Sequence, residues 1–234
     1  MEAPSLRAAF DRDGYALIEG VISADQCDAL CAALADIVLT PGSGGERNIL
    51  RRPEILQLCH HPGLASTVRE LLGPNAFAYK ATLFDKTPQA NWKVAWHQDL
   101  SIPVCGNSHP DGWKAWSVKA QVLYVQPPAE LLTRIVAVRV HLDSCGEDSG
   151  ALRVIPGSHG AGRLNPEQTE HWKAIRTPLS CGIRAGGLML MKPLLLHASS
   201  GCESPAHRRV VHLEFAAENL PAGLDWADRV SLCD

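Results

Sequence analysis

RRVVHLEF, residues 208–215, alternates in a way that decides how this chain folds. Successive side chains of a strand point to opposite faces of a sheet. One face carries the apolar Val211, Leu213 and Phe215, and the other carries Arg208, Val210, His212 and Glu214. We therefore expect the apolar face to pack under helices and the more polar face to line the interior of a barrel or sandwich.

Other short runs of β-type composition surround this one and are separated by turns rich in Gly and Pro. They are Phe77–Phe84, Val94–Leu100, Val118–Val125, Ile135–Leu142, Ala151–Ile155 and Leu188–Met191. Many short strands with such turns are typical of an antiparallel sandwich or barrel.

The first 75 residues have a helical texture instead. Ser23 and Gln26 have the spacing of a capping box, and apolar residues then recur at helical intervals as far as Val38. A second helix is predicted over Ala65–Leu72, ended by Gly73. Helices first and strands later predict helices packed on one side of the strands.

Composition excludes several classes of protein. Of 234 residues, 46% are hydrophobic and 20% are charged, which is typical of a folded globule rather than a disordered chain. The net charge is −3, and no basic stripe suggests nucleic acid or an anionic membrane as a partner. The N-terminus lacks the pattern of a secretory signal, so we expect a cytoplasmic protein whose eight cysteines are reduced thiols.

A metal-binding constellation begins at Trp96-His97-Gln98-Asp99. Residues two apart on a strand face the same side, so His97 and Asp99 can present an imidazole and a carboxylate to one point. His197 follows an apolar run, so we expect it at the end of a buried strand. It is the expected third member of a 2-His-1-carboxylate triad, the set that holds non-haem Fe(II) with open positions.

A second triplet of the same type, His141-Leu142-Asp143, has to be weighed against the first. Asp99 and His197 are separated by 98 residues, which leaves room for the several strands that lie between opposing ligands. Asp143 is only 54 residues from His197 and leads into a Ser-Cys-Gly turn, where Asp is common. The sequence favours His97 and Asp99.

Arginine is suited to a buried carboxylate, because its planar guanidinium donates two charge-assisted hydrogen bonds. Arg208 shares a strand face with His212 and Glu214, whereas Arg209 shares the apolar face. We therefore expect Arg208 to point into the interior and bind an anion.

Four pieces of this chain, in order, resemble the phytanoyl-CoA dioxygenase family of Fe(II)- and 2-oxoglutarate-dependent oxygenases. They are the segment 96–100, the run GALRVIPGSH at 150–159, His197 with the following Ala-Ser-Ser, and Arg208, which comes 11 residues after His197. The likeness extends from about residue 8 to about residue 220.

The resemblance implies a double-stranded β-helix, or jelly roll, that is mainly β with flanking helices. It implies Fe(II) on His97, Asp99 and His197, and 2-oxoglutarate on Arg208, with Ser199 and Gln98 also at the co-substrate. It implies dioxygen as a further substrate, ascorbate as a stimulant, and hydroxylation of a C–H bond of a small molecule with release of succinate and CO2.

We expect one oxygenase domain over 1–234, with a helical part over about 1–75 and a jelly-roll core over about 76–216. The chain from residue 101 to about residue 117 looks like a long loop. We therefore expect the interval 101–134 to be a possible lid or substrate region. The residues that we predict to contact substrate are Arg139, Trp113, Trp116, Lys119, Gln121 and Tyr124.

Two other functions use the same residues. A cupin-like metalloenzyme would keep the three ligands without 2-oxoglutarate, and would not need Arg208 or Ser199. A non-catalytic jelly-roll binding module would need none of this chemistry, because a fold does not determine a function.

Overall fold

The computed structural model describes residues 5–39, 45–87, 89–202 and 207–232, so the predicted domain bounds and Cys233 extend beyond the described residues. The helices are α1 (Leu6–Asp13), α2 (Ala24–Ala33), α3 (Pro53–Cys59), α4 (Pro62–Leu72), α5 (Ala129–Leu132) and α6 (Pro166–Ile175). The strands are β1 (Tyr15–Ile18), β2 (Glu46–Arg47), β3 (Phe77–Lys86), β4 (Val94–His97), β5 (Ile102–Gly106), β6 (Lys114–Lys119), β7 (Val122–Gln126), β8 (Val136–His141), β9 (Leu152–Val154), β10 (Leu179–Ser180), β11 (Leu188–Met191), β12 (His197–Ser199), β13 (Arg208–Ala216), β14 (Leu224–Trp226) and β15 (Val230–Ser231).

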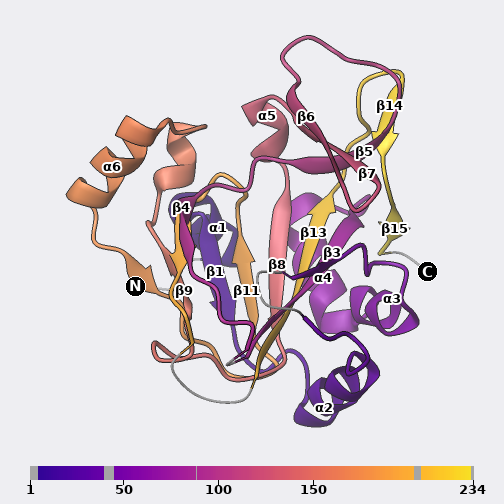
Figure 1. The fold of residues 1–234 in the computed structure, drawn as a ribbon. Coiled ribbons are helices and arrows are strands. Elements are labelled where there is room, and N and C mark those ends of the chain that lie inside the picture. The colour runs from indigo at the N-terminus through magenta and orange to yellow at the C-terminus, as the bar shows by residue number, and fades with distance from the viewer. Residues whose placement is uncertain (1–4, 40–44, 88, 203–206, 233–234) are drawn as a thin grey trace.

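The strands of the described residues form three antiparallel sheets (Figure 1). The main sheet runs β1-β11-β8-β13-β3-β15, with β2 paired to β3, and the second runs β10-β9-β12-β4. The third, β14-β5-β7-β6, stands beyond the end of the main sheet together with α5 (Figure 1). Side chains of the main and second sheets line one shared cavity, as expected for a jelly roll.

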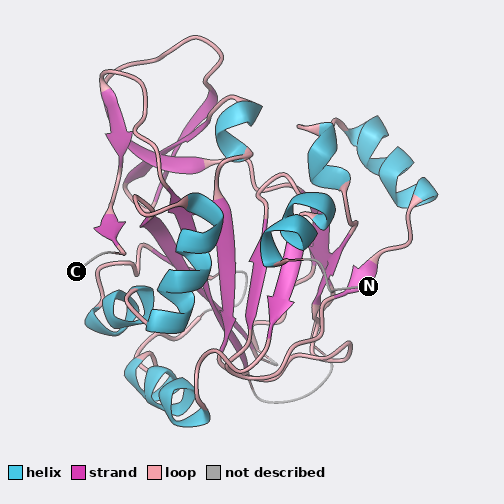
Figure 2. Ribbon diagram, turned by 180° about the vertical axis from the view of Figure 1, so that it is seen from behind, coloured by secondary structure: helices cyan, strands magenta, loops and turns pink. Residues whose placement is uncertain are grey.

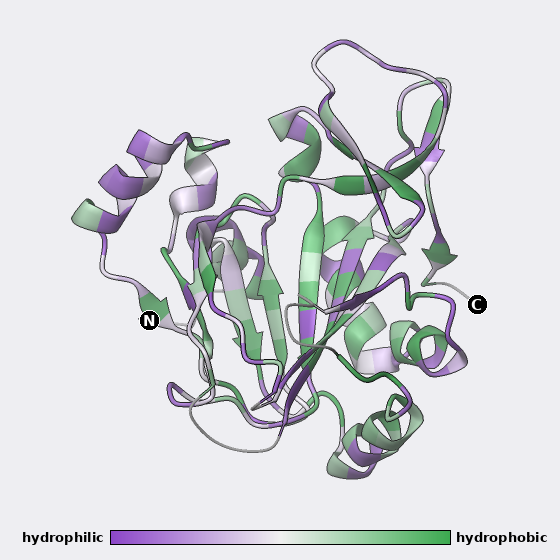
Figure 3. Cartoon of the chain, in the orientation of Figure 1, coloured by the Kyte–Doolittle hydropathy of each residue, from purple (hydrophilic) through white to green (hydrophobic). Residues whose placement is uncertain are grey.

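Helices α1 to α4 cover the outer face of the main sheet, as the view from behind shows (Figure 2). Val211, Leu213 and Phe215 are fully buried there, packed with Leu64 of α4 and other apolar helix residues. The inner face carries the polar set instead, and polar bands interrupt the hydrophobic strands of the central sheet (Figure 3). The two-faced strand predicted from residues 208–215 is confirmed.

Local signals predicted several elements well. The capping box is present, with Ser23 Oγ accepting from the Gln26 backbone and the Gln26 side chain accepting from the Ser23 backbone. The second predicted helix is α4, which begins three residues earlier than expected because Pro62 occupies its first turn. Six cysteines, Cys27, Cys31, Cys59, Cys105, Cys145 and Cys181, are free thiols.

The prediction that the first helix continues to Val38 was wrong. Helix α2 ends at Ala33, and the amides of Ala35 and Ile37 then bind carbonyls three residues earlier, as in a tight turn. Val38 is 81% exposed, so its helical spacing reflects no packing.

The single strand predicted over Val118–Val125 was also wrong. It is a hairpin of β6 and β7, joined at Ala120 and Gln121, which have φ of 47° and 63°. Both residues occupy the left-handed region that a two-residue hairpin turn requires, but neither is the Gly or Asn that signals such a turn. The prediction of a long loop from residue 101 up to about residue 117 was also wrong, because this interval contains β5 and β6, and each of them pairs with β7.

No helix among the described residues is long and apolar enough to cross a membrane.

Candidate active site

Two neighbouring strands of the second sheet bring two histidines together. His97 is the last residue of β4, and in the antiparallel pairing it lies directly opposite His197 of β12. The prediction that His197 ends a buried strand was wrong: Leu194–Leu196 form a turn, and His197 opens β12. Asp99 follows β4 and is held by its backbone amide, which donates to the Pro193 carbonyl at 2.9 Å.

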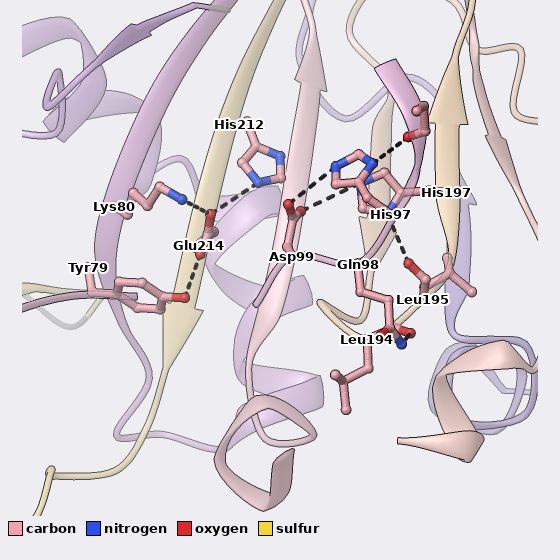
Figure 4. Close-up of polar contacts among 11 residues, drawn as sticks. Tyr79, Lys80, His97, Gln98, Asp99, Leu194, Leu195, His197, His212 and Glu214 are labelled. Carbon is pink, nitrogen blue, oxygen red and sulfur yellow. Dashed lines mark hydrogen bonds and ion pairs between the residues drawn. The ribbon is translucent and has the colours of Figure 1, made fainter. Parts of the chain in front are cut away.

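The three side chains converge on one point (Figure 4). One ligand atom from each of His97, Asp99 and His197 lies within 4.8 Å of the others. The Nε2 atoms of His97 and His197 are each 3.7 Å from an oxygen of Asp99, and the two rings are 4.1 Å apart between centroids. These separations suit three ligands around one ion, and imidazole and carboxylate are the donors that non-haem Fe(II) uses.

Hydrogen bonds orient both imidazoles toward that point. His97 Nδ1 is 2.9 Å from the Ala95 carbonyl oxygen, and His197 Nδ1 is 2.8 Å from the Leu195 carbonyl oxygen. A carbonyl oxygen can only accept, so each Nδ1 carries the proton and each Nε2 presents its lone pair. This is the usual arrangement of metal-binding histidines, in which the second nitrogen is fixed by a backbone acceptor.

The charges of the group match the same use. Burial lowers the pKa of His197 to about 4, although Asp99 acts to raise it, so His197 is a neutral imidazole near neutral pH. Burial acts to raise the pKa of Asp99, but His197, His212 and other neighbours outweigh it and lower the pKa. A neutral imidazole and an ionised carboxylate are the protonation states that bind a metal cation.

The competing triplet does not converge in this way. Asp143 is bound by the guanidinium of Arg209 through contacts of 2.9 and 2.7 Å, and it also accepts from the Arg209 backbone at 2.7 Å. His141 is buried on β8, and burial lowers its pKa well below the usual value. The favoured pair, His97 and Asp99, is the one that meets His197.

Gln98 points toward backbone rather than being free for a ligand. Its amide nitrogen donates to the carbonyls of Gly162 and Leu194 at 2.8 and 2.7 Å, and its oxygen accepts from the Leu164 amide at 2.8 Å. One amide proton therefore ties the segment that carries His97 and Asp99 to the turn before His197, and the other ties it to the end of the short helix Ser158–Ala161.

The GALRVIPGSH run supports His197 from its other side. Ser158 is fully buried, and its Oγ accepts from the Leu196 amide at 2.9 Å, while the Leu196 carbonyl accepts from Ile155. The adjacent Gly157 has φ of 79° and donates to the Asp13 carbonyl at the end of α1. This run fixes the backbone that carries His197.

Three buried cations gather at one end of the cavity: Arg139 and Arg208 line it, and Lys86 lies beside Arg208. Arg208 on β13 lies opposite Lys86 on β3, and Lys86 Nζ donates to Ser199 Oγ at 3.1 Å and to the Ser200 carbonyl. Nε and Nη1 of Arg208, and Nε of Arg139, are buried without a hydrogen-bond partner among the described residues. Burial is the largest cause that lowers the pKa of Lys86 to about 8 and that of Arg139 to about 10, and the positive charge of Arg208 is the second. Donors of this kind fit the carboxylate of a bound anion.

Glu214 anchors the other end (Figure 4). Its Oε2 accepts from the Tyr79 hydroxyl at 2.6 Å, its Oε1 accepts from Lys80 Nζ at 2.6 Å, and His212 Nε2 lies 3.3 Å from Oε1. Burial acts to raise the pKa of Glu214, but Lys80 and His212 lower it well below the usual range. Glu214 is therefore an ionised carboxylate inside the fold.

One cavity of about 470 Å³ is lined by the three candidate ligands and by the charged groups at both of its ends, namely His97, Asp99, His197, Arg139, Arg208, Lys80 and Glu214. Of the residues predicted to contact substrate, Arg139, Lys119 and Tyr124 line it. Gln121 is exposed in the β6–β7 turn, and Trp113 and Trp116 pack against the core beneath the third sheet. Those three are not among the residues that line the cavity.

The sequence analysis did not select several polar residues that lie in the cavity or directly behind its lining. Glu214 carried a usable signal, since it shares strand parity with Arg208. Lys86 had none, because its relevance comes from pairing with Arg208 across two strands that are far apart in sequence. Arg47 reaches the cavity from a two-residue strand that no periodicity could reveal.

Comparison with known proteins identifies relatives over most of the chain. The model of the phytanoyl-CoA dioxygenase (PhyH) family matches residues 10–210. Ectoine dioxygenase of Sphingopyxis alaskensis is 29% identical over 168 residues, covering 65% of this chain and 48% of that protein. L-proline trans-4-hydroxylase of Streptomyces griseoviridis is 25% identical over 218 residues, covering 80% of this chain and 74% of that protein.

Among solved structures, EctD from S. alaskensis with 2-oxoglutarate and 5-hydroxyectoine matches with a TM-score of 0.70 and 23% identity. The match covers 92% of this chain and 76% of that one, and it shows the shared jelly-roll fold. The chain spans about half the length of the curated ectoine dioxygenases that it matches.

Proposed function

This chain belongs to the phytanoyl-CoA dioxygenase family, and on that premise we propose that it is an Fe(II)- and 2-oxoglutarate-dependent oxygenase. The reaction is hydroxylation of a C–H bond of a small molecule, with dioxygen as oxidant and release of succinate and CO2. Ascorbate as a stimulant and a cytoplasmic location belong to the same proposal. The relatives named as a dioxygenase and a hydroxylase support it.

One observation carries the proposal. His97, Asp99 and His197 converge in the same cavity as a buried arginine, Arg208, whose guanidinium has unsatisfied donors among the described residues. A metal site alone would fit a cupin-like enzyme. The added anion site is what 2-oxoglutarate requires, because its distal carboxylate must be held while its other end reaches the metal.

Separate groups of residues would bind the iron and the co-substrate. His97, Asp99 and His197 would hold the iron, which with 2-oxoglutarate supplies the oxidising power for the reaction when bound. Arg208 would bind the distal carboxylate, with the Ser199 hydroxyl beside it and Lys86 behind Ser199. Arg208 and Ser199 are buried, which strengthens the charge interactions at the carboxylate end of the site.

The experiment is an anaerobic titration of the iron-loaded protein with 2-oxoglutarate, followed by visible absorption. Chelation of 2-oxoglutarate to Fe(II) gives a weak charge-transfer band, which we expect in the wild-type protein and not in His97→Ala. Arg208→Met should raise the dissociation constant of 2-oxoglutarate by about tenfold or more, because hydrogen bonds to charged groups contribute roughly 1.5–3 kcal/mol.

A matched control is Arg184→Met, since Arg184 has an 80% exposed side chain away from the cavity. An iron-loaded wild-type protein without the band would favour the cupin-like enzyme. A protein that does not hold iron at all would favour the binding module.

A further inference from the structure

The cavity has a second polar end that the proposed co-substrate site does not use. On β3, Lys86 marks the end with Arg208, and Lys80, opposite Glu214, marks the other. Lys86 is six positions after Lys80 on the strand, which places their Cα atoms about 20 Å apart. Burial acts to lower the pKa of Lys80, but the carboxylates of Glu214 and Asp99 outweigh it and raise the pKa. The Lys80 end therefore lies close to the metal-binding group.

A β-bulge builds this end. The pairing of β3 with β13 shifts between Glu214 and Phe215, so that Tyr79 is an extra residue on β3. Tyr79 and Lys80 can thus both reach Glu214, although they are consecutive residues. Glu214 is occupied by them and by His212, and its effect is to hold Lys80 in place. Lys80 Nζ uses one of its three protons on Glu214.

Tyr124 of β7 adds a buried donor beside Lys80. It is 3% exposed, it lines the cavity, and its hydroxyl has no hydrogen-bond partner among the described residues. Burial raises its pKa, so the hydroxyl keeps its proton. A buried hydroxyl without a partner is destabilising, and a ligand that accepts from it would remove that penalty.

Besides Lys80, two further cations, Lys119 and Arg47, act on Tyr124. Lys119 Nζ is 5.3 Å and Lys80 Nζ is 5.9 Å from the centre of the Tyr124 ring, and Arg47 acts electrostatically on its hydroxyl. Asn48 joins the β2 segment to the hairpin turn by donating to the Ala120 carbonyl at 3.4 Å. Arg47 and Lys119 are exposed, line the cavity and enter none of the ion pairs found among the described residues.

We propose that this end of the cavity binds a carboxylate of the substrate, with the Tyr124 hydroxyl and the Lys80 ammonium as donors and with Lys119 and Arg47 at the entrance. The substrate class is therefore a small carboxylic acid. This inference rests on the proposed oxygenase function, because it assigns the other end of the cavity to 2-oxoglutarate. The buried Tyr124 hydroxyl and the half-buried Lys80 ammonium match the two oxygens of a carboxylate, whereas a phosphate group would bring a third oxygen that has no such donor.

The test uses matched pairs of probes with the iron-loaded protein in saturating 2-oxoglutarate, without oxygen. The probes are L-proline, L-leucine, hexanoate and 3-phenylpropanoate, each beside its primary carboxamide. Dissociation constants come from the rise in melting temperature with probe concentration and from perturbation of the charge-transfer band. We expect at least one acid to bind at least tenfold more tightly than its amide.

Variants then assign that preference to this site. Tyr124→Phe removes only the unpartnered hydroxyl, so we expect it to weaken the acid about tenfold and to leave the melting temperature unchanged or higher. It should weaken the amide less, because a neutral carbonyl accepts a weaker hydrogen bond than a carboxylate does. Lys119→Ala should weaken the acid severalfold. Lys114→Ala, an exposed lysine of the same strand that does not line the cavity, is the matched control and should change neither.

Three results would overturn the inference: no acid preferred over its amide, a phosphate ester such as phosphoserine preferred over every acid, or an acid preference that survives Tyr124→Phe and Lys119→Ala together. Failure of the proposed function is read separately, from the band that 2-oxoglutarate alone produces. The melting measurement needs no such band, so the two proposals can fail independently.

Discussion

Replacing Glu214 by leucine tests whether the buried polar cluster is a structural unit. The variant removes the acceptor of two 2.6 Å hydrogen bonds and leaves Lys80 and the Tyr79 hydroxyl without it. The Glu214 side chain is 4% exposed and that of Lys80 is 18% exposed, so neither partner is freely solvated. Removing one member of a buried pair costs about 3–5 kcal/mol, because it leaves an uncompensated buried charge.

Chemical denaturation of the metal-free protein measures this free energy of unfolding directly. For a chain of this length, such a loss lowers the melting temperature by roughly 6–20 °C. The double variant Lys80→Met with Glu214→Leu removes both charges, so it should recover most of the loss. Glu170→Leu is the matched control: it breaks a lysine–glutamate contact of 2.7 Å whose glutamate is 70% exposed, and should cost less than about 1 kcal/mol.

The reasoning would be refuted in either of two ways. Glu214→Leu could prove no more destabilising than Glu170→Leu, which would mean that the cluster is solvated. Alternatively, the double variant could lose as much as the separate effects of its two substitutions combined, which would mean that the two residues do not act as a pair.

Three shorter predictions follow from the site. Asp99→Asn should abolish iron binding measured by metal analysis, whereas Asp143→Asn should retain it, and equal losses would contradict the choice between the two triplets. The pKa of Lys86 is lowered to about 8 from 10.5, so its charge is lost as pH rises through about 8; affinity for 2-oxoglutarate should weaken by up to about tenfold per pH unit above that value, and titrations of Lys86→Met should show a flatter dependence. Gln98→Leu should lower the free energy of unfolding by about 1–3 kcal/mol, because three backbone partners lose their hydrogen bonds, and an unchanged denaturation midpoint would show that these contacts contribute nothing.

Local pattern was sufficient for much of the fold. Alternation in residues 208–215 predicted a strand with one face under helices, and the capping box of α2 and the proline-initiated α4 followed from short-range hydrogen bonding and propensity. Local pattern failed where a backbone conformation had no residue signature. The turn at Ala120 and Gln121 is held by the pairing of its strands, so a hairpin was predicted as one strand.

In the candidate site, too, residue types could be predicted from the sequence and long-range pairings could not. The residue types of the candidate ligands could be read from the sequence, because two histidines and an aspartate are the donors that non-haem iron uses, and strand parity pointed Arg208 inward. The pairing of β4 with β12, the position of Lys86 opposite Arg208, and the bulge that brings Tyr79 and Lys80 onto one carboxylate became visible in the three-dimensional fold alone. These are pairings between residues far apart in the chain. Burial of the whole sheet stabilises these pairings, and that free energy depends on contacts among distant residues rather than on any short stretch of sequence.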